Sequence, residues 1–117
     1  MDWKITDGKP IWSQLQEQLT LRIIAGSYPP GSRLPSVREL AAEAGVNPNT
    51  MQRALSALEG TGLVETHRTA GRVVAVNHEA LNAERKRLAE LLIEKYLHEM
   101  QTLGFSETEA KQMVSEG

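Results

Sequence analysis

The first part of the chain has apolar residues at helical spacing in two stretches separated by a loop. In residues 10–26 they recur every four positions, which predicts an amphipathic helix. Residues 27–35 contain three of the five prolines and are expected to form a loop. A second, shorter helix is predicted behind it, because SVRE at 36–39 is a capping box, with Ser36 at the N-cap and Glu39 at N3. The periodic apolar residues of the first helix are Ile11, Leu15, Leu19 and Ile23.

A short turn containing Gly45 separates this helix from a third one, which is the arrangement of a helix-turn-helix. Asn47 stands at the N-cap and Pro48 at the first helical position, so the third helix is expected over residues 48–59. At about 100° per residue, its apolar residues share one face and leave a polar row pointing outward. The outward residues are Asn49, Gln52, Arg53 and Ser56.

After residue 62 the pattern changes from helical to β. Residues 63–66 and 72–76 are rich in β-branched side chains and are joined by a turn, which predicts a β-hairpin. Gly71 can adopt a backbone conformation that other residues avoid. Three helices followed by a hairpin predict a winged helix-turn-helix, with its wing at 66–72. Side chains at the tip of the wing are His67, Arg68, Thr69 and Arg72.

From residue 77 onward the chain is predicted to be helical again. No helix breaker occurs before Gly104, and a second capping box, Ser106 with Glu109, starts a short last helix. Two helices in about 40 residues cannot bury so broad an apolar surface within themselves. The surface is therefore expected to pack on the winged domain or on a second copy of the chain. The residues predicted for a dimer interface are Leu81, Leu88, Leu92, Tyr96, Met100 and Phe105.

These patterns predict a mainly α protein with a small β-hairpin. A winged helix-turn-helix domain is expected over residues 1–76, and a two-helix dimerisation tail over residues 77–117. The net charge of −2 divides unevenly, since residues 1–78 hold eight Lys/Arg against seven Asp/Glu and residues 79–117 hold five against eight. The placement of the basic residues therefore matters more than their sum.

Composition excludes several functional classes. There is no Cys, and the three His lie far apart, so neither a metal site nor a cofactor is expected. The chain has no nucleophile motif and no phosphate-binding Gly loop, which argues against an enzyme. No apolar run is long enough for a membrane span, and the first ten residues lack a signal peptide pattern. A cytoplasmic protein is the expectation.

Residues 10–75 resemble the DNA-binding domain of the GntR family of bacterial transcription regulators. The resemblance is carried by PGSRLPSVRELA at 30–41, by TMQRAL at 50–55 and by GLVE at 62–65. It implies that Arg38 contacts DNA, that Thr50 contacts phosphate and that Gly71 lies in or beside the minor groove. Many relatives have Arg at the positions of Pro48 and Gln52, so a base-reading Arg pair is not carried over. The short helical tail resembles the YtrA-type subfamily, in which the tail serves chiefly for dimerisation.

The outward face of the third helix suits base reading, because Asn and Gln can pair with adenine and Arg with guanine. Phosphate contacts are expected from basic residues outside that helix and from backbone N–H groups at helix starts. We therefore predict a homodimeric repressor that binds double-stranded DNA at a near-palindromic operator. The residues predicted to bind DNA are Arg33, Ser36, Arg38, Asn47, Asn49, Thr50, Gln52, Arg53, Arg68, Thr69, Gly71 and Arg72.

Alternative interpretations stay open at this point. Arg53 has two candidate roles, a phosphate contact or an ion pair within the domain. The regulator could be switched by a small-molecule effector bound at the junction of tail and wing. The near-neutral charge of the winged domain would also permit a protein-interaction module that does not bind DNA.

Overall fold

The computed structural model describes residues 3–116. The chain divides into two compact units, Met1–Leu81 and Asn82–Gly117. The division falls after Leu81, whereas the sequence predicts a boundary after Val76. The reason is that Leu81 packs in the hydrophobic core of the first unit.

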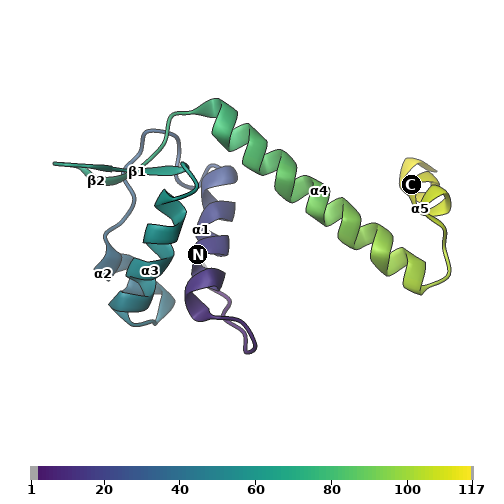
Figure 1. Cartoon of the computed structure of the whole chain (residues 1–117), viewed down its shortest axis with the longest axis horizontal. Helices are drawn as coiled ribbons and strands as arrows, with labels where there is room; N and C mark the ends of the chain where they lie inside the picture. The colour runs from purple at the N-terminus through teal and green to yellow at the C-terminus, as the bar shows by residue number, and fades with distance from the viewer. Residues whose placement is uncertain (1–2, 117) are drawn as a thin grey trace. The chain divides into compact units, whose positions relative to one another are not determined.

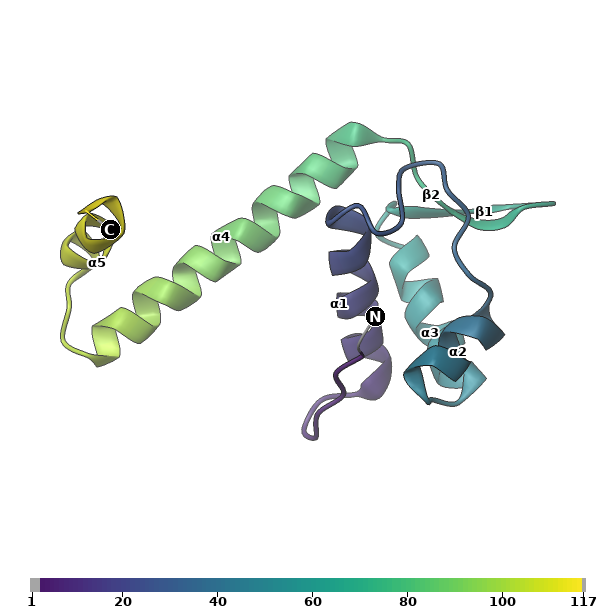
Figure 2. The same ribbon diagram turned by 180° about the vertical axis from the view of Figure 1, so that it is seen from behind.

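The first unit contains three helices and a hairpin, in the order that the sequence predicts. Its elements are α1 (Ile11–Ile24), α2 (Val37–Ala44), α3 (Pro48–Glu59), β1 (Val64–His67) and β2 (Gly71–Val74). Helices α1 and α3 lie side by side, with α2 near the start of α3 and the hairpin near its end (Figures 1 and 2). This arrangement is a winged helix-turn-helix, so the predicted fold is confirmed.

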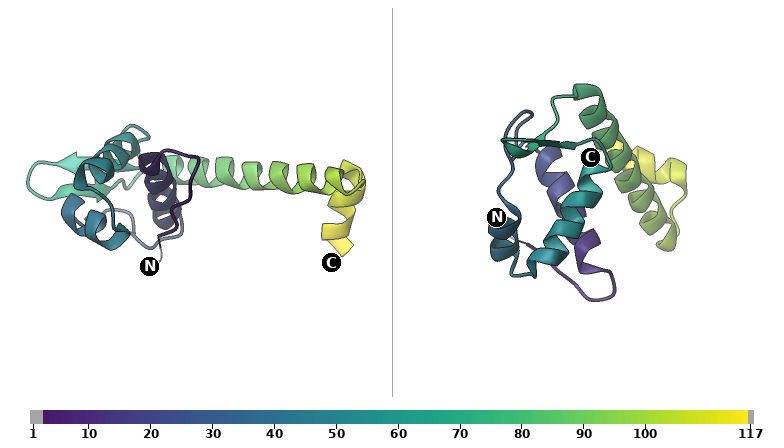
Figure 3. Two further views of the ribbon diagram at one scale, coloured as in Figure 1. Left: turned by 90° about the horizontal axis from the view of Figure 1, so that it is seen from below. Right: turned by 60° about the vertical axis from the view of Figure 1, so that its left-hand side comes forward.

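The hairpin is an antiparallel pair that is buried at one end and exposed at the other. Its register joins Val64 to Val74 at the inner end and His67 to Gly71 near the tip. Both valines are buried, whereas the tip projects beyond the helices of its own unit (Figure 3). The wing is therefore anchored in the core and presents its turn to solvent.

Residues 31–34 form a third extended segment along the free edge of β2, where the sequence predicted only a loop. The backbone N–H of Leu34 donates to the carbonyl of Arg72 at 2.9 Å, and the N–H of Val74 donates to the carbonyl of Ser32 at 2.8 Å. Leu34 precedes a proline, which favours an extended backbone, and its side chain is buried. This pairing brings Arg33 to the wing through its bridge to Val73.

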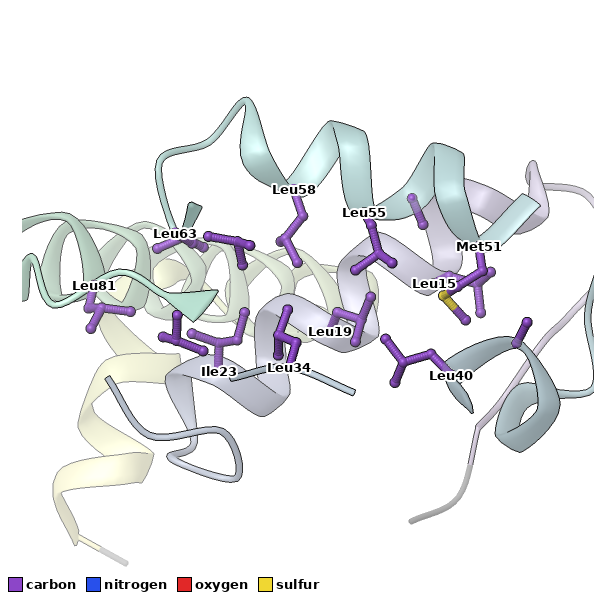
Figure 4. Close-up of a cluster of buried hydrophobic side chains, with 14 residues drawn as sticks. Leu15, Leu19, Ile23, Leu34, Leu40, Met51, Leu55, Leu58, Leu63 and Leu81 are labelled. Atoms are coloured by element: carbon purple, nitrogen blue, oxygen red, sulfur yellow. The ribbon is translucent and has the colours of Figure 1, made fainter. Parts of the chain in front are cut away.

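The core of the first unit is aliphatic, and α1 and α3 supply half of its buried residues (Figure 4). The four apolar residues predicted for one face of α3 have no exposed surface, so that face is confirmed. Burying a Leu side chain stabilises a fold by about 1.5–3 kcal/mol, so this cluster is the main source of the unit's stability. The buried residues of α3 are Met51, Ala54, Leu55 and Leu58.

Leu81, in the first turn of α4 (His78–Thr102), completes this core. Its side chain is only 5% exposed, and it lies at the end of the cluster close to Leu63 and Ile23 (Figure 4). A side chain enclosed by its own unit offers almost no surface to other molecules. Leu81 therefore has little surface left for a partner subunit, and its place in a dimer interface stays a prediction.

The N-terminal segment, for which the sequence suggested no structure, is held along α1. The side-chain amide of Gln14 accepts from the backbone N–H of Thr6 at 2.8 Å and donates to its carbonyl at 2.8 Å. Gln18 makes the same pair of bonds with Lys4, at 2.9 and 2.5 Å. One turn further along α1, the guanidinium carbon of Arg22 lies 3.8 Å from the ring centroid of Trp3. The three residues of α1 that hold the segment are Gln14, Gln18 and Arg22.

The second unit consists of the rest of α4 and of α5 (Glu107–Glu116). Helix α4 ends in a Schellman motif at Gly104, since Gly104 has φ of +94° and the N–H of Phe105 donates to the carbonyl of Met100 at 3.2 Å. The predicted capping box of α5 is also present, with Ser106 Oγ accepting from the N–H of Glu109 at 3.1 Å.

Helix α5 folds back on the end of α4. The hydroxyl of Tyr96 donates to the carbonyl of Ala110 at 2.9 Å, and Ala110 is fully buried. Large apolar side chains elsewhere in this unit remain exposed, with Leu92 at 68% and Leu103 at 72%. Half-buried positions among those predicted for a dimer interface are Leu88, Tyr96, Met100 and Phe105.

Candidate nucleic-acid interface

The helix-turn-helix is held by side chains that cap both of its helices. Ser36 Oγ accepts from the N–H of Glu39 at 3.1 Å, and Glu39 Oε1 accepts from the N–H of Ser36 at 3.3 Å. In the turn, Gly45 has φ of +69°, a conformation that favours glycine, and it closes α2. Asn47 Oδ1 then accepts from the N–H of Asn49 at 2.8 Å and starts α3. Because these bonds are local, the starting point of α3 is set by its own sequence.

The outward face of α3 carries the polar side chains that the sequence placed there. Asn49, Gln52, Arg53 and Ser56 are exposed, and Thr50 is half-buried. Gln52 Nε2 donates to Ser56 Oγ at 3.3 Å, which joins two of these side chains along the helix. The face therefore offers amide and hydroxyl groups with little charge. Base contacts by these residues stay a prediction.

Arg53 is held by a contact that neither sequence interpretation included. Its guanidinium carbon lies 4.5 Å from the ring centroid of Trp12 in α1. A guanidinium over an indole ring is attracted by the electron density on the face of the ring. This contact ties α3 to α1 and fixes where the charge of Arg53 lies.

At the wing, the two predicted basic residues have different surroundings. Arg68 and Thr69 are exposed at the tip, next to Gly71 with φ of +76°. Arg72 instead has a side chain that is only 19% exposed, and its Nε donates to Glu59 Oε1 at 2.6 Å. Arg72 therefore packs inward against the end of α3, and a contact between Arg72 and DNA stays a prediction.

Glu59, the last residue of α3, was not among the predicted site residues. Its Oε1 also accepts from Thr66 Oγ1 at 2.5 Å. The bond from Thr66, together with the bond and charge of Arg72, lowers the pKa of Glu59 from its ordinary value against the opposing effect of partial burial. A carboxylate at the C-terminal end of a helix is unfavourable for the helix dipole, and that signal could have drawn attention to Glu59.

The remaining predicted phosphate contacts lie outside α3. Arg33 and Arg38 are both exposed, the first beside β2 and the second in the first turn of α2. Ser36 and Asn47 are exposed N-caps, and each uses its side-chain oxygen for its own helix. At these two positions any DNA contact would have to come from backbone N–H groups that the caps leave unpaired.

Within residues 3–116 no group of three or more His, Asp and Glu side chains is arranged to hold a metal ion. Over the same residues, no helix combines the length and the apolar content that crossing a membrane requires.

The family model described as "Bacterial regulatory proteins, gntR family" matches residues 12–74, which is more than half of the chain and includes the whole helix-turn-helix and wing. The chain belongs to the GntR family. It is thus a transcriptional regulator with a DNA-binding helix-turn-helix domain, and its family is not one of enzymes.

Two relatives place this GntR regulator more narrowly. It is 37% identical to the HTH-type transcriptional regulator YhcF of Bacillus subtilis over 109 residues, which cover 93% of this chain and 90% of YhcF. It is 39% identical to the HTH-type transcriptional repressor YtrA of the same organism over 77 residues, which cover 66% of this chain and 59% of YtrA. The resemblance to the YtrA-type subfamily is confirmed.

Solved structures agree with the fold of this GntR regulator. A GntR family transcriptional regulator from Listeria monocytogenes superposes with a TM-score of 0.85 at 33% identity, covering 97% of this chain and 99% of that one. The DNA-binding domain of AraR in complex with its operator ORX1 superposes with a TM-score of 0.55 at 25% identity, covering 64% of this chain and 92% of AraR's domain.

Proposed function

We propose that this GntR regulator is a homodimeric repressor that binds a near-palindromic operator, with α3 in the major groove and the wing beside it. The observation that carries the proposal is the outward face of α3. Asn49, Gln52 and Ser56 are exposed hydrogen-bonding side chains on a helix whose start is capped and whose opposite face is fully buried. A helix of this kind can enter the major groove and read base edges.

Contacts to the DNA phosphates would come from elements other than α3. Arg33, Arg38 and Arg68 are exposed on the extended segment, on α2 and at the wing tip. Arginine binds phosphate oxygens strongly and in a fixed geometry. The similarity to the AraR domain, which was solved in complex with its operator, supports a DNA-binding role for these three elements. Sparse charge on α3 is then consistent with DNA binding.

The second unit supports the homodimer. Its exposed large apolar side chains are Leu91, Leu92, Ile93, Leu103, Met113 and Val114. A unit of 36 residues with this much exposed apolar surface gains stability by covering it. A second copy of the chain would cover it, and two-fold symmetry would then present two α3 helices to the two halves of an operator.

Fluorescence anisotropy tests the proposal. The full chain is titrated onto a duplex from the region upstream of its own gene and onto a scrambled duplex, at several salt concentrations. We expect tighter binding to the upstream duplex, with log affinity falling steeply against log salt concentration. Arg38→Ala should weaken binding at least about tenfold, because it removes a charge-assisted contact. Equal affinity for both duplexes would refute sequence-specific binding, and an unchanged affinity of Arg38→Ala would refute that contact.

A further inference from the structure

One carboxylate oxygen joins the end of α3 to both strands of the wing. Glu59 Oε1 accepts from Thr66 Oγ1 of β1 at 2.5 Å and from Arg72 Nε of β2 at 2.6 Å. Thr66 and Arg72 are direct cross-strand partners, so their side chains stand on the same face of the hairpin. A slip of one residue in the pairing would turn one of the two donors to the other face. The shared oxygen therefore specifies both the register and the position of the hairpin.

These three residues sit where the wing leaves the core. Val64 and Val74, the pair two positions nearer the core, are buried, whereas His67 and Gly71, the next pair toward the tip, are exposed. Glu59 and Arg72 are themselves partly enclosed, at 31% and 19% exposure of their side chains. Beyond this level the exposed tip makes few apolar contacts, so polar bonds at this point have a large influence on the direction of the wing.

We propose that Glu59, Thr66 and Arg72 form a wing clamp that sets the position of the wing relative to α3 for binding DNA. The inference rests on the proposed DNA-binding function and assigns roles within it. Arg72 is a positioning residue that acts through Glu59, whereas Arg68 at the tip remains the basic residue that reaches phosphate. Glu59 is a positioning residue although its charge opposes DNA.

Because Glu59 is negatively charged, a simple charge effect and the wing clamp predict opposite changes in DNA affinity when the carboxylate is removed. If charge alone mattered, removing a carboxylate near the DNA face would tighten binding, because repulsion from phosphate falls. The wing clamp requires the opposite, since removing the acceptor releases the wing. Glu59→Ala and Glu59→Gln remove the same charge, but only Gln keeps an oxygen that can accept from Thr66 and Arg72. The difference in DNA affinity between these two variants therefore reports the effect of the hydrogen-bond acceptor separately from the effect of the charge.

The first measurement does not depend on DNA. Amide hydrogen exchange of residues 60–76 is followed in the full chain and in both Glu59 variants. We expect at least about fivefold faster exchange in the hairpin of Glu59→Ala, corresponding to the loss of roughly one net hydrogen bond, and exchange within about twofold of the parent chain in Glu59→Gln. Equal exchange in all three chains would overturn the wing clamp.

The second measurement is anisotropy with the upstream duplex across the same salt series. We expect Glu59→Ala to bind at least about fivefold more weakly with an unchanged salt slope, and Glu59→Gln to bind within about twofold of the parent chain. Glu65→Ala is the charge control, because Glu65 stands on the opposite face of β1 and is absent from the clamp. It should leave affinity unchanged or slightly raise it.

Arg72→Gln separates positioning from direct phosphate contact. If Arg72 is a positioning residue, Arg72→Gln should bind the duplex more weakly than the parent chain, with an unchanged slope of log affinity against log salt concentration. A slope that falls by about 0.9 with undisturbed hairpin exchange would identify Arg72 as a phosphate contact and overturn the proposal. If Glu59→Ala does not fold, Thr66→Val and Thr66→Ser give the same comparison, with and without a hydroxyl donor. If the parent chain binds no duplex, the proposed function fails, and hydrogen exchange still decides the clamp.

Discussion

Two leucines of the same helix should respond in opposite ways to the same substitution. Leu81 is 5% exposed in the core of the first unit, whereas Leu92 is 68% exposed in the second. Leu81→Ala removes a buried side chain at the edge of the core, for which we expect a loss of about 2–3 kcal/mol, the low end for buried Leu→Ala changes. Alanine favours helix at least as well as leucine, so helix propensity does not contribute to the loss.

For a unit of this size, a loss of 2–3 kcal/mol lowers Tm by at least about 8 °C. The assay is thermal and urea unfolding of both variants over a wide range of protein concentration. The loss in Leu81→Ala should be the same at every concentration, because the side chain packs within one chain. Leu92→Ala should change monomer stability by less than about 0.5 kcal/mol and should weaken self-association. The reasoning is refuted if the two variants lose equal stability, or if the loss in Leu81→Ala vanishes on dilution.

Two further predictions concern contacts that surround α3. Arg53→Ala should lower the free energy of unfolding by about 0.5–1 kcal/mol, because the contact with Trp12 is lost. In the Trp12→Leu background the same change should cost nearly nothing, and a double-mutant cycle by urea unfolding measures the difference. Equal costs in both backgrounds would exclude the cation–π contact. The pKa of Glu59 is lowered from its ordinary value of 4.5, so the stability it contributes is fully present above that value and is lost as the pH falls through the lowered pKa. The stability difference between the parent chain and Glu59→Ala, from urea unfolding between about pH 7 and pH 3, should therefore shrink at the acid end, and a difference that does not change with pH would contradict this assignment.

In the proposed complex, the polar face of α3 reads base pairs, and the basic groups around it bind phosphate. Exposed amides and hydroxyls can distinguish base pairs without much charge. Arginines on α2, at the wing and on the segment beside β2 supply the attraction to phosphate, which is independent of sequence. Arg53 and Arg72 are engaged with Trp12 and Glu59 within the protein, so each of these two charges has a partner in its own unit.

The sequence by itself determined the features that depend on neighbours along the chain. Capping bonds at Ser36, Asn47 and Ser106 span two or three residues, so their donors and acceptors are adjacent in the sequence. The buried face of α3 follows from helical periodicity for the same reason, since residues on one face repeat at a fixed spacing. The hairpin, too, was visible in two β-branched runs around a turn.

Only the tertiary structure decided the contacts between residues that are distant in the chain. In the sequence, Leu81 is one of several apolar residues in a predicted tail helix. Its place in the core depends on where α4 begins relative to α1 and the hairpin. The segment at 31–34 has the composition of a loop and becomes extended because β2 offers it a free edge. The sequence placed Arg72 at the tip of the wing, and its pairing with Glu59, 13 residues away, follows only from the fold. A periodic pattern assigns a residue to a face, but which partner that face meets is set by packing.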